Sequence, residues 1–125
     1  MTTVQQWLLP AALAGRDVLA YAATGSGKTA AYIIPCLSAV WQYGRVTYPD
    51  AREVHPQPSV VIMCPMRELV YQVTAVAEDL LTSSGVVVCM VCSGINFMDP
   101  LLKGSDVVVG TLGGLPLAHK HEALQ

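Results

Sequence analysis

Charged side chains are scarce in this sequence. Asp, Glu, Lys and Arg make up 13% of its 125 residues, whereas hydrophobic residues make up 53%. A chain this apolar is not an intrinsically disordered tail, which combines low hydrophobicity with high net charge. The formal net charge of −2 excludes a global basic field, so any nucleic acid has to be bound by a local group of side chains. The length allows one compact domain at most.

Long hydrophobic runs are missing as well. A membrane-spanning helix needs roughly 18 consecutive apolar residues. Prolines and charged residues interrupt the runs of the amino-terminal part before that length, at Pro10, Arg16, Asp17 and Pro35. The amino terminus has no basic cluster ahead of an apolar segment, so a secretory signal is not expected. We therefore expect a soluble protein without a membrane partner.

Cysteine is too sparse for a disulfide-stapled fold. The four cysteines, Cys36, Cys64, Cys89 and Cys92, lie inside apolar segments. Cys89 and Cys92 have CxxC spacing, but no second pair accompanies them, and residues three apart on a strand point to opposite faces. We expect buried free thiols and an intracellular location, cytoplasmic or nuclear.

Short apolar runs alternate with segments of helical periodicity. Four runs predict strands at 17–22, 59–64, 86–92 and 106–110. Apolar residues at helical spacing predict two helices, with the stripes Ile33, Ile34, Leu37, Val40, Trp41 and Leu69, Val73, Val76, Leu80, and Asp99 with Pro100 predicts a short third. This order predicts an α/β fold with a mainly parallel sheet, in which residues 44–59 form a surface loop.

The stretch AATGSGKT, residues 22–29, has the composition of a phosphate-binding loop. Glycines let successive backbone N–H groups turn toward an anion, a lysine reaches the outer phosphates, and a hydroxyl binds magnesium. The strict pattern has glycine where Ala22 stands, so the loop is a variant. Its place between a predicted strand and a predicted helix is typical of such loops.

With the loop, the surrounding motifs resemble the first RecA-like domain of DEAD-box RNA helicases. The resemblance rests on five signals in the family's order. They are TTVQ (2–5) as the end of the Q motif, LAGRDVLAYAATGSGKTAAYIIPCL (13–37) as motif I, PMRELVYQ (65–72) as motif Ia, SG (93–94) as the glycine doublet, and GSDVVVGTLGGL (104–115) as the motif Ib segment. It implies a RecA-like P-loop three-layer sandwich, incomplete over residues 1–125.

The resemblance also implies ligands and roles. It implies ATP with Mg²⁺, Gln5 on the adenine, Lys28 on the outer phosphates and Thr29 on magnesium, these last two being the candidate catalytic residues. The loop residues implied to surround the nucleotide are Ala23, Thr24, Gly25, Ser26 and Gly27. Single-stranded or duplex RNA is the implied partner, and the implied RNA-binding residues are Pro65, Arg67, Gly94, Thr111 and Gly113. For Arg67, a solvated helix start is the alternative interpretation.

Four positions depart from the family pattern. Met66 stands in place of a threonine, Ser93 of a glycine, Leu112 of a proline and Gly114 of an arginine. Loss of one phosphate contact should lower the salt slope of RNA binding by about one and weaken the affinity.

Residues 1–125 contain no DExD-type acidic motif. We therefore expect a partial helicase ATP-binding domain that does not hydrolyse ATP by itself and whose parent protein has a second RecA-like domain. In this partial domain, the predicted strand 17–22 would have an apolar edge without a neighbouring strand. Two alternatives stay open, a catalytically degenerate helicase-like RNA-binding or scaffold module and another ATPase that shares only the loop.

Overall fold

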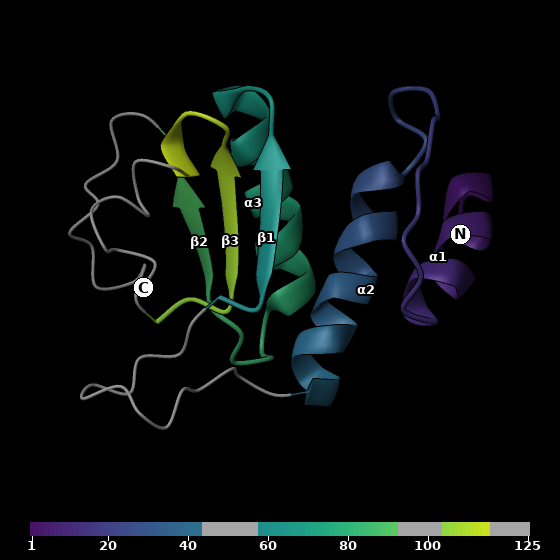
Figure 1. Cartoon of the computed structure of the whole chain (residues 1–125), viewed down its shortest axis with the longest axis horizontal. Helices are drawn as coiled ribbons and strands as arrows, with labels where there is room; N and C mark the ends of the chain where they lie inside the picture. The colour runs from purple at the N-terminus through teal and green to yellow at the C-terminus, as the bar shows by residue number, and fades with distance from the viewer. Residues whose placement is uncertain (44–57, 93–103, 116–125) are drawn as a thin grey trace. The chain divides into compact units, whose positions relative to one another are not determined.

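A computed structural model describes residues 1–43, 58–92 and 104–115 of the chain (Figure 1). The chain divides into two compact units, Met1–Gly44 and Arg45–Gln125. The predicted helix at Asp99–Pro100 and the predicted loop up to residue 57 lie outside the described residues.

The first unit contains two helices that pack on each other, α1 (Thr3–Leu13) and α2 (Lys28–Tyr43). Helix α1 begins with a capping box, in which Thr2 and Gln5 each bond the other's backbone N–H. Helix α2 contains Pro35 and runs to Tyr43. Its buried residues Ile33, Leu37 and Val40 confirm most of the predicted stripe, whereas Trp41 is 57% exposed.

The predicted strand at 17–22 is not a strand in the structure, and this prediction was wrong. Residues 16–23 connect α1 to the loop without belonging to helix or sheet. A strand requires a hydrogen-bonded neighbour, and within the described part of the chain the backbone of residues 18–21 makes no hydrogen bond. The apolar run therefore has the composition of a strand but no partner.

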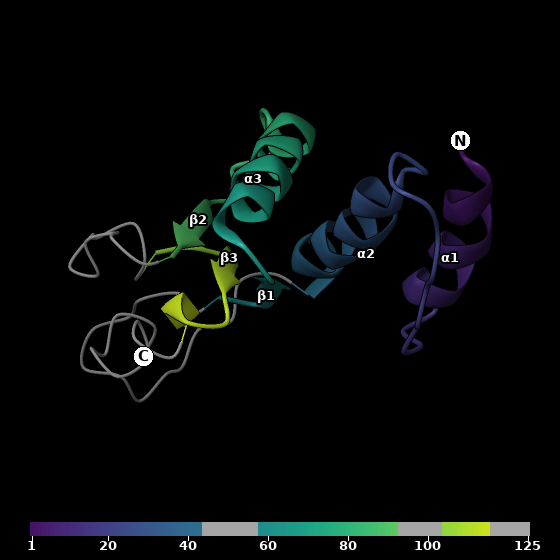
Figure 2. The ribbon, with the colours of Figure 1, turned by 90° about the horizontal axis from the view of Figure 1, so that it is seen from above.

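The second unit contains a three-stranded parallel sheet with one helix, α3 (Arg67–Leu81), on one face (Figures 1 and 2). Its strands are β1 (Val60–Cys64), β2 (Val88–Val91) and β3 (Val107–Thr111), which confirm three of the four predicted strands. The order is β1-β3-β2, so β3 is central. All three valines of β3, residues 107–109, are buried, as expected for the middle strand of a covered sheet.

Asp106 organises the amino ends of the three strands. Its carboxylate oxygen Oδ2 accepts a hydrogen bond from the N–H of Val87 at 2.9 Å, and its own N–H donates to the carbonyl of Val87 at 2.9 Å. The carbonyl of Asp106 accepts from the N–H of Ser59 at 2.8 Å. The side chain is fully buried. Asp106 therefore links the segments that lead into β1 and β2 to the central strand.

Helix α3 buries a different face from the predicted one. The predicted stripe held Leu69, Val73, Val76 and Leu80, but of these only Val73 is buried, and Leu80 is 41% exposed. The buried residues are Val70, Val73, Thr74, Ala77 and Leu81. The small residues at 74 and 77 allow the helix to lie close to the sheet, a factor that a count of large apolar side chains misses.

Among the described residues, none of the helices combines the length and hydrophobicity needed to cross a membrane.

Candidate functional site

The loop before α2 is shaped by two glycines. Gly25 and Gly27 have φ angles of +79° and +88°, which L-residues with side chains rarely adopt. The turn is closed by the N–H of Ser26, which donates to the carbonyl of Ala23 at 3.2 Å. Within the described residues, the N–H groups of Gly27, Lys28 and Thr29 have no acceptor. They lie at the start of a 16-residue helix, where the helix dipole favours negative charge.

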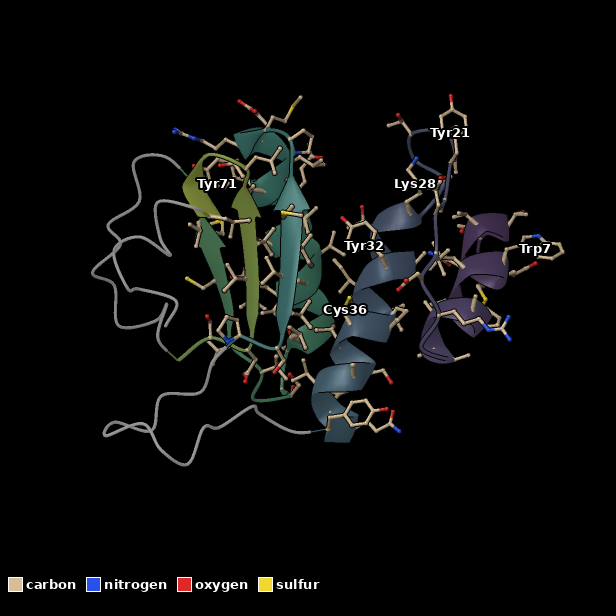
Figure 3. The ribbon with its side chains drawn as sticks, in the orientation of Figure 1. Trp7, Tyr21, Lys28, Tyr32, Cys36 and Tyr71 are labelled. Atoms are coloured by element: carbon tan, nitrogen blue, oxygen red, sulfur yellow. The ribbon has the colours of Figure 1, made fainter. Side chains whose placement is uncertain are left out.

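Lys28 brings a positive charge to the same place. It is the first residue of α2, at the end of the helix next to the loop (Figure 3). Its ammonium group donates to the carbonyl of Ala23 at 2.8 Å and also to the carbonyl of Ala22. These loop carbonyls hold the ammonium at the helix start, where a bound phosphate group would be a stronger acceptor. Thr29 follows in the first turn and is half-buried.

Gly27 also has no room for a side chain. A Cβ atom at this position would lie 2.7 Å from Nε2 of Gln5 and 2.9 Å from Oγ1 of Thr2. The amide Nε2 of Gln5 donates to the carbonyl of Gly27 at 3.2 Å. The amino end of α1 and the loop are thus in direct contact, although 22 residues separate Gln5 from Gly27.

The amide group of Gln5 joins two elements at once. Its oxygen Oε1 accepts from the N–H of Thr2 at 3.0 Å and so completes the cap of α1. Its nitrogen contacts the loop. A primary amide has two donors and two acceptor positions, so one of each stays available to a ligand. The structure therefore places the predicted adenine-binding residue beside the predicted phosphate-binding residues, within one unit.

These residues fit ATP. The predicted cofactor-binding residues 23–29 are consecutive, and the helix start supplies N–H groups, an ammonium and the hydroxyl of Thr29. The hydroxyl of Ser26 is buried without a hydrogen-bond partner among the described residues, so it can bind a ligand oxygen. No group of His, Cys, Asp or Glu in the described residues could hold a metal by itself. Magnesium would therefore bind through Thr29 and the phosphates.

The second candidate set lies at the carboxyl edge of the sheet in the second unit. The last residues of β1 and β3, Cys64 and Thr111, are register partners, so Pro65 and Gly113 follow at the same edge. Arg67 begins α3 next to this edge and is exposed. The hydroxyl of Thr111 accepts from the N–H of Gly114 at 3.1 Å and fixes the turn. Gly94 lies outside the described residues.

Two departures from the family pattern expose apolar side chains at this edge, since Met66 is 56% and Leu112 is 65% exposed. The third departure, glycine at position 114 in place of an arginine, removes a positive charge and lies where there is no room for a side chain. Gly114 is buried, and a Cβ atom there would lie 2.7 Å from the carbonyl oxygen of Val91 and 2.8 Å from Cα of Cys92. The turn after β3 therefore packs against the end of β2 where the family has an arginine.

Known proteins share this combination of loop and sheet. The model of the DEAD/DEAH box helicase family matches residues 2–124. The chain belongs to the DEAD/DEAH box helicase family. The chain is 36% identical over 115 residues to the ATP-dependent RNA helicase drs1 of Schizosaccharomyces pombe, covering 90% of this chain and 14% of that protein. It is 34% identical to the ATP-dependent RNA helicase SrmB of Escherichia coli, covering 91% of this chain and 25% of that protein.

Solved structures of helicases agree with the fold. The RNA helicase Prp28 from Chaetomium thermophilum, bound to ADP, superimposes with a TM-score of 0.81 at 30% identity and covers all of this chain. A hypothetical ATP-dependent RNA helicase from Sulfolobus tokodaii gives 0.75 at 29% identity over 98% of this chain. The chain spans 30% and 32% of these two structures. The RecA-like α/β fold class predicted from the sequence is thereby confirmed.

In this helicase-family domain, the sequence prediction missed Thr2. Its side chain caps α1 and lies against Gly27 of the loop. The signal was present, because Thr2 and Gln5 have the T-x-x-Q spacing of a capping box. The four cysteines are free thiols, and the predicted burial holds for Cys64 and Cys92, whereas Cys36 and Cys89 are half-buried. Burial raises the pKa of Cys36 and Cys64 above the ordinary value. A raised pKa disfavours the reactive thiolate, which agrees with a packing role.

Proposed function

We propose that this chain is the ATP-binding part of an ATP-dependent RNA helicase. The proposal rests on one observation above all, the contact of Gln5 and Lys28 with a single glycine loop at the start of α2. In it, Gln5 selects adenine with its remaining amide groups, and the loop N–H groups with Lys28 bind the phosphates. Bound ATP with Mg²⁺ supplies the phosphoryl group, and Thr29 holds the metal.

The test is equilibrium binding of a fluorescent ATP analogue to the chain. Lys28→Ala removes the only ammonium at the loop among the described residues, so the affinity should fall by about a hundredfold or more. Arg16→Ala is the matched control, because it also removes one positive charge from an exposed site of the same unit. An unchanged affinity of Lys28→Ala would disprove the loop assignment.

We further propose that residues 1–125 by themselves bind ATP without turnover. Hydrolysis requires carboxylates that fix magnesium and orient the attacking water. Asp17 is the one carboxylate among residues 1–43, and five residues separate it from the start of the loop stretch 23–29. Phosphate release at the rate of buffer alone is the expected result. Release above that rate, abolished by Lys28→Ala, would contradict it.

We propose that RNA contacts the carboxyl edge of the second unit through Arg67, Thr111, Gly113 and Pro65, with Gly94 as a further contact. The exposed Met66 and Leu112 favour a second candidate, a degenerate helicase-like binding or scaffold module, because they present apolar surface where the family binds sugar and phosphate. Arg67→Ala tests whether RNA binds at this edge, which is expected for a helicase or a degenerate RNA-binding module but not for a scaffold module. If RNA binds there, the variant should weaken binding to all sequences alike and lower the salt slope by about one.

A further inference from the structure

Two apolar residues lie at the carboxyl edge of the sheet, where the family pattern has a threonine and a proline. Met66 comes two residues after Cys64, the last residue of β1, and Leu112 comes directly after Thr111, the last residue of β3. Because Cys64 and Thr111 are register partners on adjacent strands, the two apolar residues emerge at neighbouring points of the same edge. Both belong to the second unit, so this juxtaposition does not depend on where the first unit lies.

The local backbone keeps both side chains at the surface of the second unit. Met66 is the N-cap of α3 and has an extended backbone, with φ −143° and ψ 157°. Its side chain makes no capping hydrogen bond, whereas a threonine at this position could accept one from the first turn of the helix. Leu112 lies in the turn that the hydroxyl of Thr111 fixes through the N–H of Gly114. Methionine at position 66 therefore gives up a polar cap and adds an apolar contact surface.

The surroundings of this pair favour a small, flat ligand that carries a negative charge. Gly113, next to Leu112, is exposed, and a Cβ atom there would have no neighbour within 4 Å, so a ligand has room to approach the backbone. Arg67 follows Met66, is exposed and brings a positive charge to the edge. Two apolar side chains cover far less area than the roughly 800 Å² that each partner of a stable protein complex contributes. A nucleotide, with an apolar base face and a charged phosphate, matches this combination better than a protein surface does.

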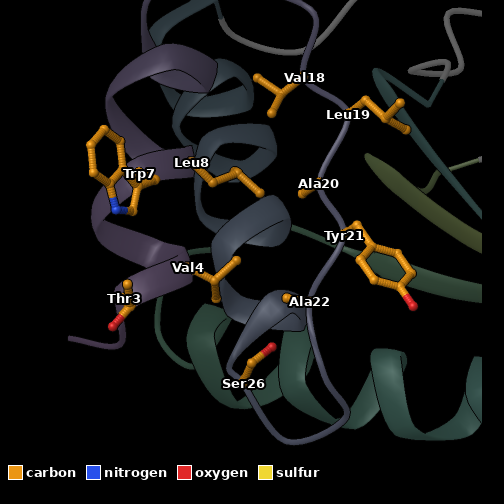
Figure 4. Close-up of a pocket in the computed structure, with 10 residues that line it drawn as sticks. All are labelled: Thr3, Val4, Trp7, Leu8, Val18, Leu19, Ala20, Tyr21, Ala22 and Ser26. Atoms are coloured by element: carbon orange, nitrogen blue, oxygen red, sulfur yellow. The ribbon is translucent and has the colours of Figure 1, made fainter.

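The apolar hollow of the first unit lacks such a charge. It has a volume of about 480 Å³ and is lined by residues of α1, of the connection 18–22 and of the loop (Figure 4). None of these described lining residues carries a charge. A nucleotide of an RNA strand would therefore find no cation for its phosphate among the residues of the hollow, whereas Arg67 supplies one at the sheet edge.

We propose that this edge binds an unpaired base of single-stranded RNA against Met66 and Leu112, with the adjoining phosphate at Arg67. The inference rests on the proposed RNA contact at this edge and deepens it, since it names the part of the RNA that is bound. The thioether of methionine is polarizable and contacts aromatic rings favourably, and contact with the face of a base tolerates any base. In a duplex the bases are paired and stacked, so their faces are covered. The edge should therefore select single strands over duplexes.

Two oligonucleotides of equal length separate base contacts from backbone contacts. One is a single-stranded RNA, and the other is an abasic strand with the same ribose and phosphate groups but no bases. In fluorescence anisotropy titrations, the full chain should bind the base-containing strand about tenfold more tightly than the abasic strand. This ratio of affinities should not change with salt, because both strands carry the same phosphates. An RNA duplex of the same length should also bind more weakly than the base-containing strand.

Variants at the edge locate the base contact. Met66→Thr and Leu112→Ser each remove apolar surface, so each should lower the ratio of affinities by about threefold and leave the binding of the abasic strand unchanged. Leu80→Ser is the matched control, because it also makes an exposed apolar side chain polar, but near the other end of α3. It should keep the ratio of the wild type. Circular dichroism shows whether each variant keeps its fold.

The outcomes distinguish this inference from the proposed RNA contact on which it rests. Equal binding of both strands by the wild-type chain would overturn the base contact and leave an RNA contact through the backbone standing. A ratio that neither edge variant changes, or that Leu80→Ser lowers equally, would place the base contact elsewhere and overturn the inference too. No binding of any strand by a folded wild-type chain would instead contradict the proposed RNA contact itself, and the inference with it.

Discussion

Main-chain groups make up the anion site that we propose in the first unit, whereas the site that we propose at the sheet edge of the second unit consists mainly of side chains. In the first unit, two left-handed glycines and a helix start orient the N–H groups, and Lys28 adds the charge. In the second unit, Arg67 stands beside the exposed apolar residues Met66 and Leu112. A site made of backbone depends on few side chains, so we expect it to tolerate Ala22, while a site made of side chains should change with each substitution.

The largest effect should come from filling the space at Gly27. In Gly27→Ala, the added methyl meets Gln5 and Thr2 at under 3 Å, and the φ of +88° is strained for alanine. The left-handed conformation costs about 1–2 kcal/mol, and the methyl pushes the amide of Gln5 away from the carbonyl of Gly27, which removes a hydrogen bond worth about 1 kcal/mol. Affinity for a fluorescent ATP analogue should therefore fall by about a hundredfold.

Gly15→Ala is the control for the strain at Gly27. Gly15 has a φ of +75°, but nothing lies within 4 Å of an added Cβ, and it stands outside the loop. This variant should lose stability in thermal unfolding and keep its affinity for nucleotide. An equal loss of affinity in both variants would show that backbone strain, and not contact with the end of α1, governs the loop.

The second unit should respond in opposite ways to arginine at two neighbouring glycines. Gly114→Arg introduces the residue that the resemblance implies here, but its Cβ would meet the backbone of β2, so unfolding should become easier by about 2 kcal/mol. Gly113 is exposed and has open space. Gly113→Arg should leave stability unchanged, tighten binding of single-stranded RNA and raise its salt slope by about one. Thermal unfolding and RNA titrations at several salt concentrations measure both effects.

The reverse outcome would also be informative. If Gly114→Arg is as stable as the wild type and binds RNA more tightly, the turn after β3 adapts easily, and the loss of arginine at this position is a change of charge alone. The contrast between a main-chain site in the first unit and a side-chain site in the second would then depend on the exposed Met66 and Leu112 alone.

The sequence predicted the loop better than the sheet. Glycines at fixed spacing before a helix determine a local backbone shape, so the turn at residues 23–29 could be predicted without knowledge of the rest of the fold, while its binding of a nucleotide stays a prediction. Strand 17–22 was predicted from composition alone, and composition does not supply a pairing partner. The stripe on α3 was misplaced because Thr74 and Ala77 pack closely through their small size, which a hydrophobic pattern does not register.

The smallest expected effect separates the two roles of Gln5. Gln5→Glu keeps an oxygen to accept from the N–H of Thr2, so the cap of α1 is retained, but it removes the donor to the carbonyl of Gly27. Glutamate has no N–H, so the variant loses both the donor to Gly27 and the donor proposed for adenine. At about 1 kcal/mol for each hydrogen bond, nucleotide affinity should fall by roughly thirtyfold while the melting temperature changes little. Gln6→Glu is the control, because it adds the same charge at an exposed neighbouring position. Equal losses in the two variants would mean that the added charge acts at long range, and the contact between α1 and the loop would then have no part in binding.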